Sequence, residues 1–443
     1  MLPAGRGRMA RSGDVSALVY LDGITYQPWV YLHDESNGSA SHVRLPVESP
    51  SPNEWWGASY VLTDYGELTI LSGNGPVYVR TYQLAGTPLA TQAALISTRT
   101  FGDPDSRAGP LTELDSGALV GVWRQQGQTG PQGMGVAHRA VDGTWSSSFP
   151  IGLMPTTASK QVVLQHPVDG SVWIFNNADA ASAIGAARLT ESGSGLTVDW
   201  VDSLWLYAEG AYKPDPENPD LVGAVDPSTG TIVLAYQSAV RKIFSVSPFV
   251  AGSHVAVARV SANGARSYTS LPIYVERIAP LALVVRTGEV SLAYRPIDLT
   301  TLNFGDLSVS VQREGTWSDP VVLGTLSHRY NPIWYASGTH TFLAKMADGR
   351  FHWFELETDP ATSPSPSPTS DASSTPAPDP EPTPTPEPEP PAPDPSEEPS
   401  PSESPAPEPT AEPTSSPDSG PQGPPSNGKV SPKCKGSKNE RCT

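Results

Sequence analysis

The chain has 443 residues, of which 17% are charged and 37% hydrophobic, and its formal net charge at pH 7 is −18. This acidity disfavours a nucleic-acid partner, because the neutralisation of phosphates needs clustered Lys and Arg. No run approaches the roughly 18 apolar residues of a membrane-spanning helix, so we expect no membrane span.

The first residues have no clear structural pattern, and we expect residues 1–13 to be disordered. The start of the chain, MLPAGRGRMARSGDVSALVYLDG, carries positive charges but lacks the apolar stretch of a signal peptide. The sequence therefore predicts either export by another route or a true start that lies upstream.

From residue 14 to residue 358 the chain repeats one pattern, in which a strand, a Gly-bearing turn and a second strand are followed by two further strands. The first hairpins of six units lie roughly 50 to 60 residues apart, at 56–71, 110–123, 161–175, 218–236, 280–294 and 332–346. Four antiparallel strands per unit are typical of a propeller blade. The sequence thus predicts an all-β propeller of about six four-stranded blades.

Two of these units share the segment Gly-Thr-Trp-Ser. It occurs in DGTWSSSFPIG (142–152) and again in EGTWSDPVVLG (314–324), so that Trp145 and Trp317 hold equivalent positions. We expect the segment to form the turn into an outer strand, and both tryptophans to pack between blades.

The two ends of the repeat region are each incomplete. Residues 17–46 contain two or three strands without a clear innermost one, whereas residues 332–357 supply inner strands. We expect the two ends to build one blade together, since a sheet made from both termini leaves no free edge. Seven blades, with thin blades at the ends, are the alternative.

The Gly-Thr-Trp-Ser turns and the segment ADGRFHWFELE (347–357) resemble sialidase-type, BNR-like six-bladed propellers and propeller lectins. The turns depart from the Asp-box of that family, because Asp142 directly precedes Gly143 and Glu314 stands in place of the aspartate. The resemblance implies carbohydrate binding, or glycoside hydrolysis by arginines, a Tyr–Glu pair and an aspartate. No residue of this chain matches those catalytic positions, so no catalytic residue is predicted.

Charged residues of both signs gather in the loops that join one blade to the next. Such loops lie around the channel of a propeller, where ligands bind. The predicted ligand-binding residues are Asp103, Asp105, Arg107, Asp215, Glu217, Glu276, Arg277, His328, Arg329 and Tyr330. The alternative is that these polar loops are only connectors.

No metal and no cofactor are predicted. The acidic segment 212–220 lacks the spacing and the glycine of an EF-hand, and no nucleophile elbow of the Gly-x-Ser-x-Gly type is present. We expect His166, His254 and His340, which lie within strand patterns, to be structural residues with satisfied hydrogen bonds.

Residues 359–443 differ sharply from the rest, because they hold 26 of the 49 prolines and no aromatic residue. We expect residues 359–432 to be a disordered Pro-, Ser-, Thr- and Glu-rich linker or stalk. Residues 433–443 are basic and contain Cys434 and Cys442, which could form a disulfide in an oxidising setting. This segment is interpreted as an anchor to a partner; the alternative is a solvated appendage.

Together these features predict a recognition propeller that binds carbohydrate or a cell-surface group and is displayed on a Pro-rich stalk. Its location would be extracellular, at a cell surface or on a virion. Two alternatives stay open: a sialidase-like glycoside hydrolase, and a structural or host-recognition protein of a virus or phage tail.

Overall fold

β-Strands are the main secondary structure of the described residues. The computed structural model describes residues 2–3 and 10–355, except residues 23, 48–51, 56–57, 64–65, 87–88, 126–132, 154–160, 179–182, 193–194, 209, 215–220, 244–250, 277–280, 299–303, 327–332, 336–340 and 349–350. The helical elements of this part are two 3-10 turns, η1 (Pro52–Trp55) and η2 (Gly210–Tyr212).

The strands follow one another blade by blade along the chain. Blade I contains β1 (Leu2–Pro3), β2 (Ala10–Ser12), β3 (Val15–Leu21), β4 (Pro28–Asp34) and β5 (Ala40–Arg44). Blade II contains β6 (Ser59–Leu62), β7 (Glu67–Ser72), β8 (Val77–Ala85) and β9 (Gln92–Phe101). Blade III contains β10 (Arg107–Glu113), β11 (Leu119–Gln125), β12 (Gly133–Arg139) and β13 (Phe149–Ile151).

The second half of the repeat region continues in the same way. Blade IV contains β14 (Gln161–Gln165), β15 (Val172–Ala178), β16 (Ala183–Ser192) and β17 (Gly195–Tyr207). Blade V contains β18 (Leu221–Val225), β19 (Ile232–Ile243), β20 (Ala251–Val260) and β21 (Arg266–Glu276). Blade VI contains β22 (Ala282–Arg286), β23 (Glu289–Tyr294), β24 (Leu307–Arg313), β25 (Thr316–Trp317) and β26 (Val321–Gly324). A C-terminal sheet contains β27 (Ile333–Tyr335), β28 (Thr341–Lys345) and β29 (Phe351–Glu355).

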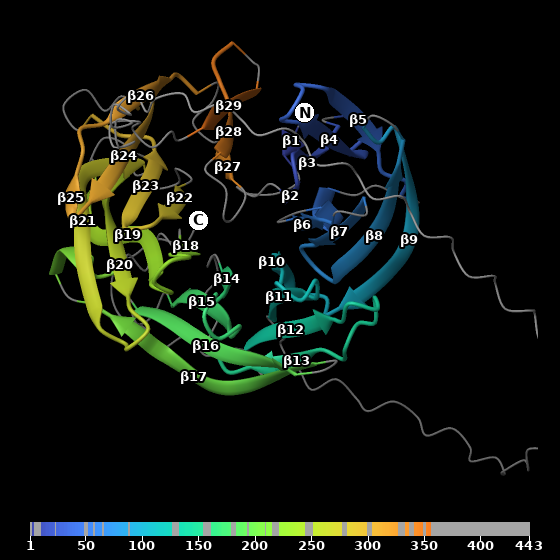
Figure 1. Ribbon diagram of the computed structural model, residues 1–443, viewed down its shortest axis with the longest axis horizontal. Coiled ribbons are helices and arrows are strands. Elements are labelled where there is room, and N and C mark those ends of the chain that lie inside the picture. The colour runs from blue at the N-terminus through green and yellow to red at the C-terminus, as the bar shows by residue number, and fades with distance from the viewer. Residues whose placement is uncertain are drawn as a thin grey trace, which may run out of the picture. The chain divides into compact units, whose positions relative to one another are not determined.

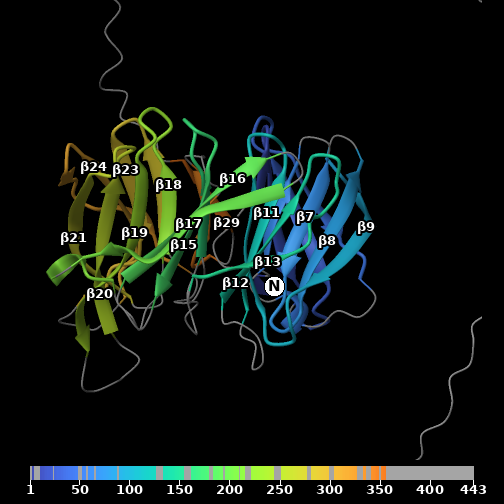
Figure 2. The same cartoon turned by 90° about the horizontal axis from the view of Figure 1, so that it is seen from below.

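Each blade is an antiparallel sheet in which strands adjacent in sequence are paired. Blades II to V have four strands. Blade I has a divided first strand, because β1 and β2 both pair with β3, and blade VI has a divided fourth strand, because β25 and β26 both pair with β24. The sheets stand around a common centre with the first strand of each blade innermost (Figure 1), and their strands run between two faces of the ring (Figure 2). The predicted all-β propeller with six four-stranded blades is confirmed, and in the described residues the three-stranded C-terminal sheet follows blade VI as a seventh sheet.

The turn between the first two strands repeats its geometry from blade to blade. In blade IV the N–H of Gly170 donates to the carbonyl of His166 at 2.9 Å, and in blade V the N–H of Gly230 donates to the carbonyl of Asp226 at 2.8 Å. Both glycines have a φ of +68°, a left-handed conformation that costs glycine no steric strain. The Asp-Gly and Thr-Gly pairs of the sequence therefore fix where each hairpin reverses.

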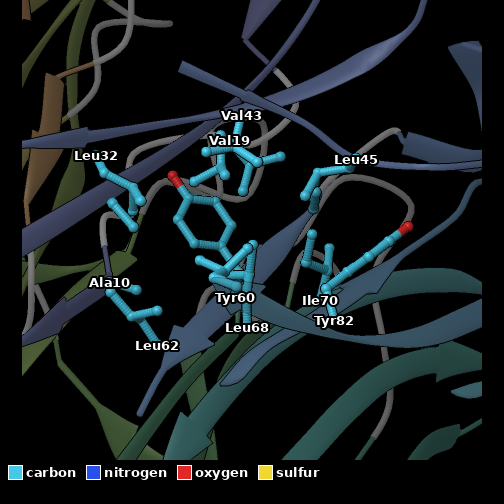
Figure 3. Close-up of a cluster of buried hydrophobic side chains, with 14 of the residues drawn as sticks. Ala10, Val19, Leu32, Val43, Leu45, Tyr60, Leu62, Leu68, Ile70 and Tyr82 are labelled. Carbon is cyan, nitrogen blue, oxygen red and sulfur yellow. The ribbon is translucent and has the colours of Figure 1, made fainter. Parts of the chain in front are cut away.

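The hydrophobic core consists of separate clusters, and each cluster lies between two consecutive sheets. The cluster between blades I and II is shown in Figure 3, where Tyr60, Leu68, Ile70 and Tyr82 of blade II meet side chains such as Val19 of blade I. Equivalent clusters join each later pair of neighbours up to blade VI and the C-terminal sheet. Each large apolar side chain buried there stabilises the ring by about 1.5–3 kcal/mol, so neighbouring blades depend on one another.

The Gly-Thr-Trp-Ser segments take the predicted place at the entrance to an outer strand. Trp145 is 7% exposed and lies in the core between blades II and III, with its ring 5.7 Å from that of Phe101. Trp317 is half-buried against the core between blades V and VI. Both tryptophans thus pack between blades.

The two ends of the ring differ from the expectation. Residues 2–3 and 10–12 were expected to be disordered, but they form β1 and β2, and Ala10 is buried in the first core cluster. Blade I therefore has its own innermost strand. In the part of the chain that the structure describes, blade I and the C-terminal sheet share no strand, so the expected composite blade was wrong for these residues. The reason is that the short segment around Ala10 already pairs along β3.

Candidate functional site

The antiparallel order of the strands means that each described blade begins and ends its strands at the same face of the ring. The first strand of a blade starts at this face, and the second strand returns to it. We call it the loop face; it carries, among others, the connections 73–76 and 102–106. The opposite face carries the tight hairpins, such as 166–171 and 226–231, and is called the hairpin face.

Three segments of the loop face are bonded to one another through their backbones. The N–H of Asn74 donates to the carbonyl of Asn53 at 2.8 Å, and the N–H of Gly75 donates to the carbonyl of Ser106 at 2.9 Å. The N–H of Ala108 donates to the carbonyl of Gly73 at 3.0 Å. The start of blade II, its central connection and the entry to blade III therefore form one continuous surface.

Asp103 and Asp105, which the sequence predicts as ligand contacts, lie on this surface with different roles. Oδ1 of Asp103 accepts hydrogen bonds from the Ser106 hydroxyl at 2.9 Å and from the N–H of Asp105 at 3.3 Å. The Asp103 carboxylate thus holds the turn, whereas Asp105 is exposed at the tip of the turn. Asp105 is the one of the two whose side chain is available to a ligand.

Arg107 begins the innermost strand of blade III and is directly opposite Arg124 on the next strand. Arg107 is exposed and Arg124 is 5% exposed. Like charges directly opposite each other on antiparallel strands are unfavourable, and the register of β10 shifts immediately after Ala108. Bulges of this kind re-aim side chains and are frequent beside functional sites.

The polar surface continues into blade IV. Gln161, at the start of β14, lies so close to Gly109 that a Cβ at that glycine would be 2.8 Å from Oε1 of Gln161. Gln161 is directly opposite Asn176 in the β14–β15 register. We use the name polar arc for Arg107, Arg124, Gln161 and Asn176. Two guanidinium groups beside two amides can bind anionic and hydroxyl-bearing ligands.

The position of Arg124 and Asn176 recurs around the ring. In blades II to VI the part of the second strand toward the loop face has a large apolar or aromatic residue followed by a buried polar one, and these polar residues are 0–8% exposed. They are Ser72, Arg124, Asn176, Gln237 and Arg295. The repeated pair, as in Trp123-Arg124 or Tyr294-Arg295, is a signal that the sequence carries and that our prediction from loops missed.

A second cluster lies where blade I meets blade II. Nη2 of Arg80 is 2.5 Å from Oε2 of Glu54, and its guanidinium carbon is 5.2 Å from the centre of the Trp55 ring and 4.6 Å from that of Tyr78. Nη1 of Arg80 and Nε1 of Trp55 are buried and have no hydrogen-bond partner among the described residues. Arg80 therefore holds the rings of Trp55 and Tyr78 in place beside the surface that the three backbone-bonded segments form.

The structure gives no side-chain position for the other predicted ligand contacts. Asp215, Glu217, Arg277, His328, Arg329 and Tyr330 lie outside the described residues. Glu276 ends β21, where its backbone pairs with Gly252. Of the predicted set, the structure brings together Asp103, Asp105 and Arg107.

The described residues have neither a metal-binding cluster nor a membrane-spanning helix. No group of three or more His, Cys, Asp or Glu side chains there is arranged to hold a metal ion. No helix in the same residues is long and apolar enough to cross a membrane.

Comparisons with known proteins give the fold. No protein-family model matches the chain, and no curated protein matches it. Among solved structures, a PL25 polysaccharide lyase, an ulvan lyase bound to -[GlcA(1-4)Rha3S]-, has 9% identity and a TM-score of 0.50 over 80% of this chain and 92% of its own. The polysaccharide lyase Uly1 has 12% identity, a TM-score of 0.46 and coverage of 80% and 90%. The propeller domain of the Trilobed protease from Pyrococcus furiosus has 9% identity, a TM-score of 0.41 and coverage of 79% and 94%.

Proposed function

We propose that the propeller binds a polysaccharide that carries carboxylate or sulfate groups, and that the polar arc is the central part of the site. The observation that carries this proposal is the pairing of Arg107 with Arg124 on adjacent strands at the loop face. An anion beside these two arginines accepts charge-assisted hydrogen bonds from their guanidinium groups. The amides of Gln161 and Asn176 are suited to hydroxyl groups of the same ligand.

The charge of the chain makes this concentration of arginines informative. The whole sequence has a net charge of −18, so a general attraction for polyanions is not expected. An acidic polysaccharide must be held by local contacts instead. Asp105 lies close by in sequence and discriminates between ligands, because it repels an anion placed on its side of Arg107. Glu276, Arg277, His328, Arg329 and Tyr330 stay candidate contacts of the same ligand, on the evidence of the sequence alone.

Display on a stalk completes the proposal. Residues 359–432 would keep the propeller away from the body to which residues 433–443 attach it, at a cell surface or on a virion. The alternation of Pro with Asp and Glu favours an extended chain. A recognition protein that works at a distance from its anchor needs such a spacer.

The binding proposal is tested with the full chain and three polymers. Polygalacturonate and a sulfated polymer, dextran sulfate, should retard the protein in affinity electrophoresis, whereas neutral dextran should do so less. Arg107→Gln should weaken binding of the charged polymers by about 1.5–3 kcal/mol, roughly 10- to 150-fold. Arg313→Gln is the matched control, since Arg313 is an exposed arginine of the hairpin face that forms an ion pair with Glu289. Equal binding by parent and Arg107→Gln protein contradicts the proposal.

A further inference from the structure

We infer that His254 and Tyr274 form a second binding subsite on the loop face, and that it takes a neutral, hydroxyl-rich sugar unit of the same polysaccharide. The inference rests on the proposed function, because it extends the site from blades III and IV to blade V. The two residues lie on the neighbouring outer strands β20 and β21 (Figure 1). Their ring centres are 4.3 Å apart, with an angle of 57° between the planes, and both side chains are partly exposed.

His254 differs from the other histidines that the structure describes in its hydrogen bonding. His42 bonds to the Tyr20 hydroxyl at 2.9 Å, and His138 to Glu191 at 3.1 Å. His166 bonds to the carbonyl of Gly230 at 2.8 Å, as expected for a structural histidine, and His352 to Asp348 at 2.8 Å. His33 is stacked on Tyr31 with ring centres 6.3 Å apart and has a further interaction, although its Nδ1 is buried without a hydrogen-bond partner among the described residues.

In contrast, the ring nitrogens of His254 form no hydrogen bond to any described residue, and the same is true of the Tyr274 hydroxyl. Neither group is among the buried polar atoms that lack a partner. Both groups are therefore reached by solvent and are open to a ligand. The proposed subsite gives His254 a ligand contact in place of the structural role expected from the sequence. His340, expected to have the same role, lies outside the described residues.

The backbone around His254 is irregular on both sides. Toward β19 the register shifts between the pairs Gln237–Val255 and Arg241–Ser253, and toward β21 it shifts between Ser253–Val275 and Val255–Leu271. On each side, three residues of the neighbouring strand are opposite His254 alone. A regular four-stranded blade needs no such interruption. Bulges on both sides of one residue turn its side chain out of the alternating pattern of the strand.

The chemistry of the pair indicates a neutral ligand. Burial lowers the pKa of His254, so the imidazole is uncharged near neutral pH, where it offers one donor and one acceptor. The Tyr274 hydroxyl is a second donor and acceptor, and its ring gives an apolar face of the kind that packs against the C–H groups of a pyranose. A pair of adjacent hydroxyl groups can bond to both residues at once. The subsite thereby complements the charged contacts of the polar arc.

The test uses the full-length protein and hyaluronate, a polymer in which a carboxylate-bearing sugar alternates with a neutral one, together with its dimer and its longer oligomers. His254→Ala and Tyr274→Phe should each weaken binding of the polymer and the longer oligomers by roughly two- to tenfold. The dimer, which is too short to reach beyond the polar arc, should bind to these variants as it does to the parent. His352→Ala is the control, since His352 is an exposed histidine of the C-terminal sheet.

The outcomes separate this inference from the proposed function. Arg107→Gln should weaken binding of every oligomer, whereas the blade V variants should remove only the gain that comes with chain length. Unchanged polymer binding by both His254→Ala and Tyr274→Phe, with the effect of Arg107→Gln intact, would overturn the subsite and leave the proposed function standing. If Arg107→Gln binds like the parent, the proposed function fails first. Neither His254→Ala nor Tyr274→Phe removes a core side chain. The thermal midpoint of each variant should therefore stay close to that of the His352→Ala control.

Discussion

The replacement Gly135→Ala provides a sharp test of the packing between strands of blade III. Gly135 on β12 is directly opposite Trp123 on β11, and the indole ring lies across the glycine. A Cβ at residue 135 would be 2.3 Å from both Cε2 and Nε1 of Trp123 and 2.6 Å from Cζ2. Carbon atoms in ordinary contact are about 3.5–4.0 Å apart, so the ring would have to move by more than about 1 Å.

Trp123 has no room for such a movement. It is 0% exposed, and its other face is stacked on Phe101 with ring centres 5.2 Å apart. Overpacking of a closed core costs about 1–3 kcal/mol, and we expect Gly135→Ala to lower the free energy of unfolding by at least this amount. Gly152→Ala is the matched control, because no atom lies within 4 Å of a Cβ built there; its effect should stay within about 0.5 kcal/mol.

The assay is equilibrium unfolding of the full chain in urea, followed by tryptophan fluorescence. A second pair of variants isolates the cause: in a Trp123→Leu background the added methyl group should cost far less, since the two residues are in contact and their effects are not additive. If Gly135→Ala unfolds at the same urea concentration as Gly152→Ala, the close packing of Trp123 on Gly135 is refuted.

Three further predictions concern the hairpin face, the first blade and the tail. The Ser228 hydroxyl and the N–H of Gly288 donate hydrogen bonds to the Asp226 carboxylate at 2.6 and 3.2 Å. Burial of the carboxylate raises its pKa, but the hydrogen bonds have the larger effect, so the pKa of Asp226 is lowered. Asp226→Ala should therefore cost about 1.5–3 kcal/mol at neutral pH, and the gap to the parent should close as pH falls below about 4, where the parent loses this contribution; a constant gap between pH 7 and pH 3 would contradict this. Deletion of residues 1–12 should lower the thermal midpoint, because it removes the inner strand of blade I, and an unchanged midpoint would mean that β1 and β2 are dispensable. Small-angle scattering of the full chain should give a maximum dimension well above that of a chain cut after residue 358, as expected for an extended Pro-rich segment; nearly equal dimensions would contradict the spacer.

The sequence allowed the fold to be predicted because its main signals are local. Alternating apolar residues, turn glycines such as Gly170 and Gly230, and the repeat of Trp145 at Trp317 each depend on a few neighbouring residues. Such signals identify strands and hairpins, and their repetition indicates blades. The ends of the ring were harder to predict, because the short strand at residues 10–12 has no pattern of its own and forms by pairing with β3.

The candidate site was predicted only in part, for the same physical reason. Loop composition pointed to Asp103, Asp105 and Arg107, but not to their different roles. That Asp103 holds a turn follows from its bonds to Ser106 and Asp105, and the sequence Asp-Pro-Asp-Ser allows other arrangements. The buried residues Arg124 and Asn176 were overlooked, since a polar residue at the end of an apolar strand has no meaning until its neighbours are known.

The sequence by itself therefore determined the class of fold, the repeated blade and the boundary at which a Pro-rich tail begins, because composition and short-range periodicity suffice for these. Only the tertiary structure decided which residues face one another. The registers that place Arg107 opposite Arg124, and His254 next to Tyr274, depend on bulges in strands that are paired over long distances. A shift of one residue in such a register would send each side chain to the other face of its sheet, and local sequence does not specify that shift.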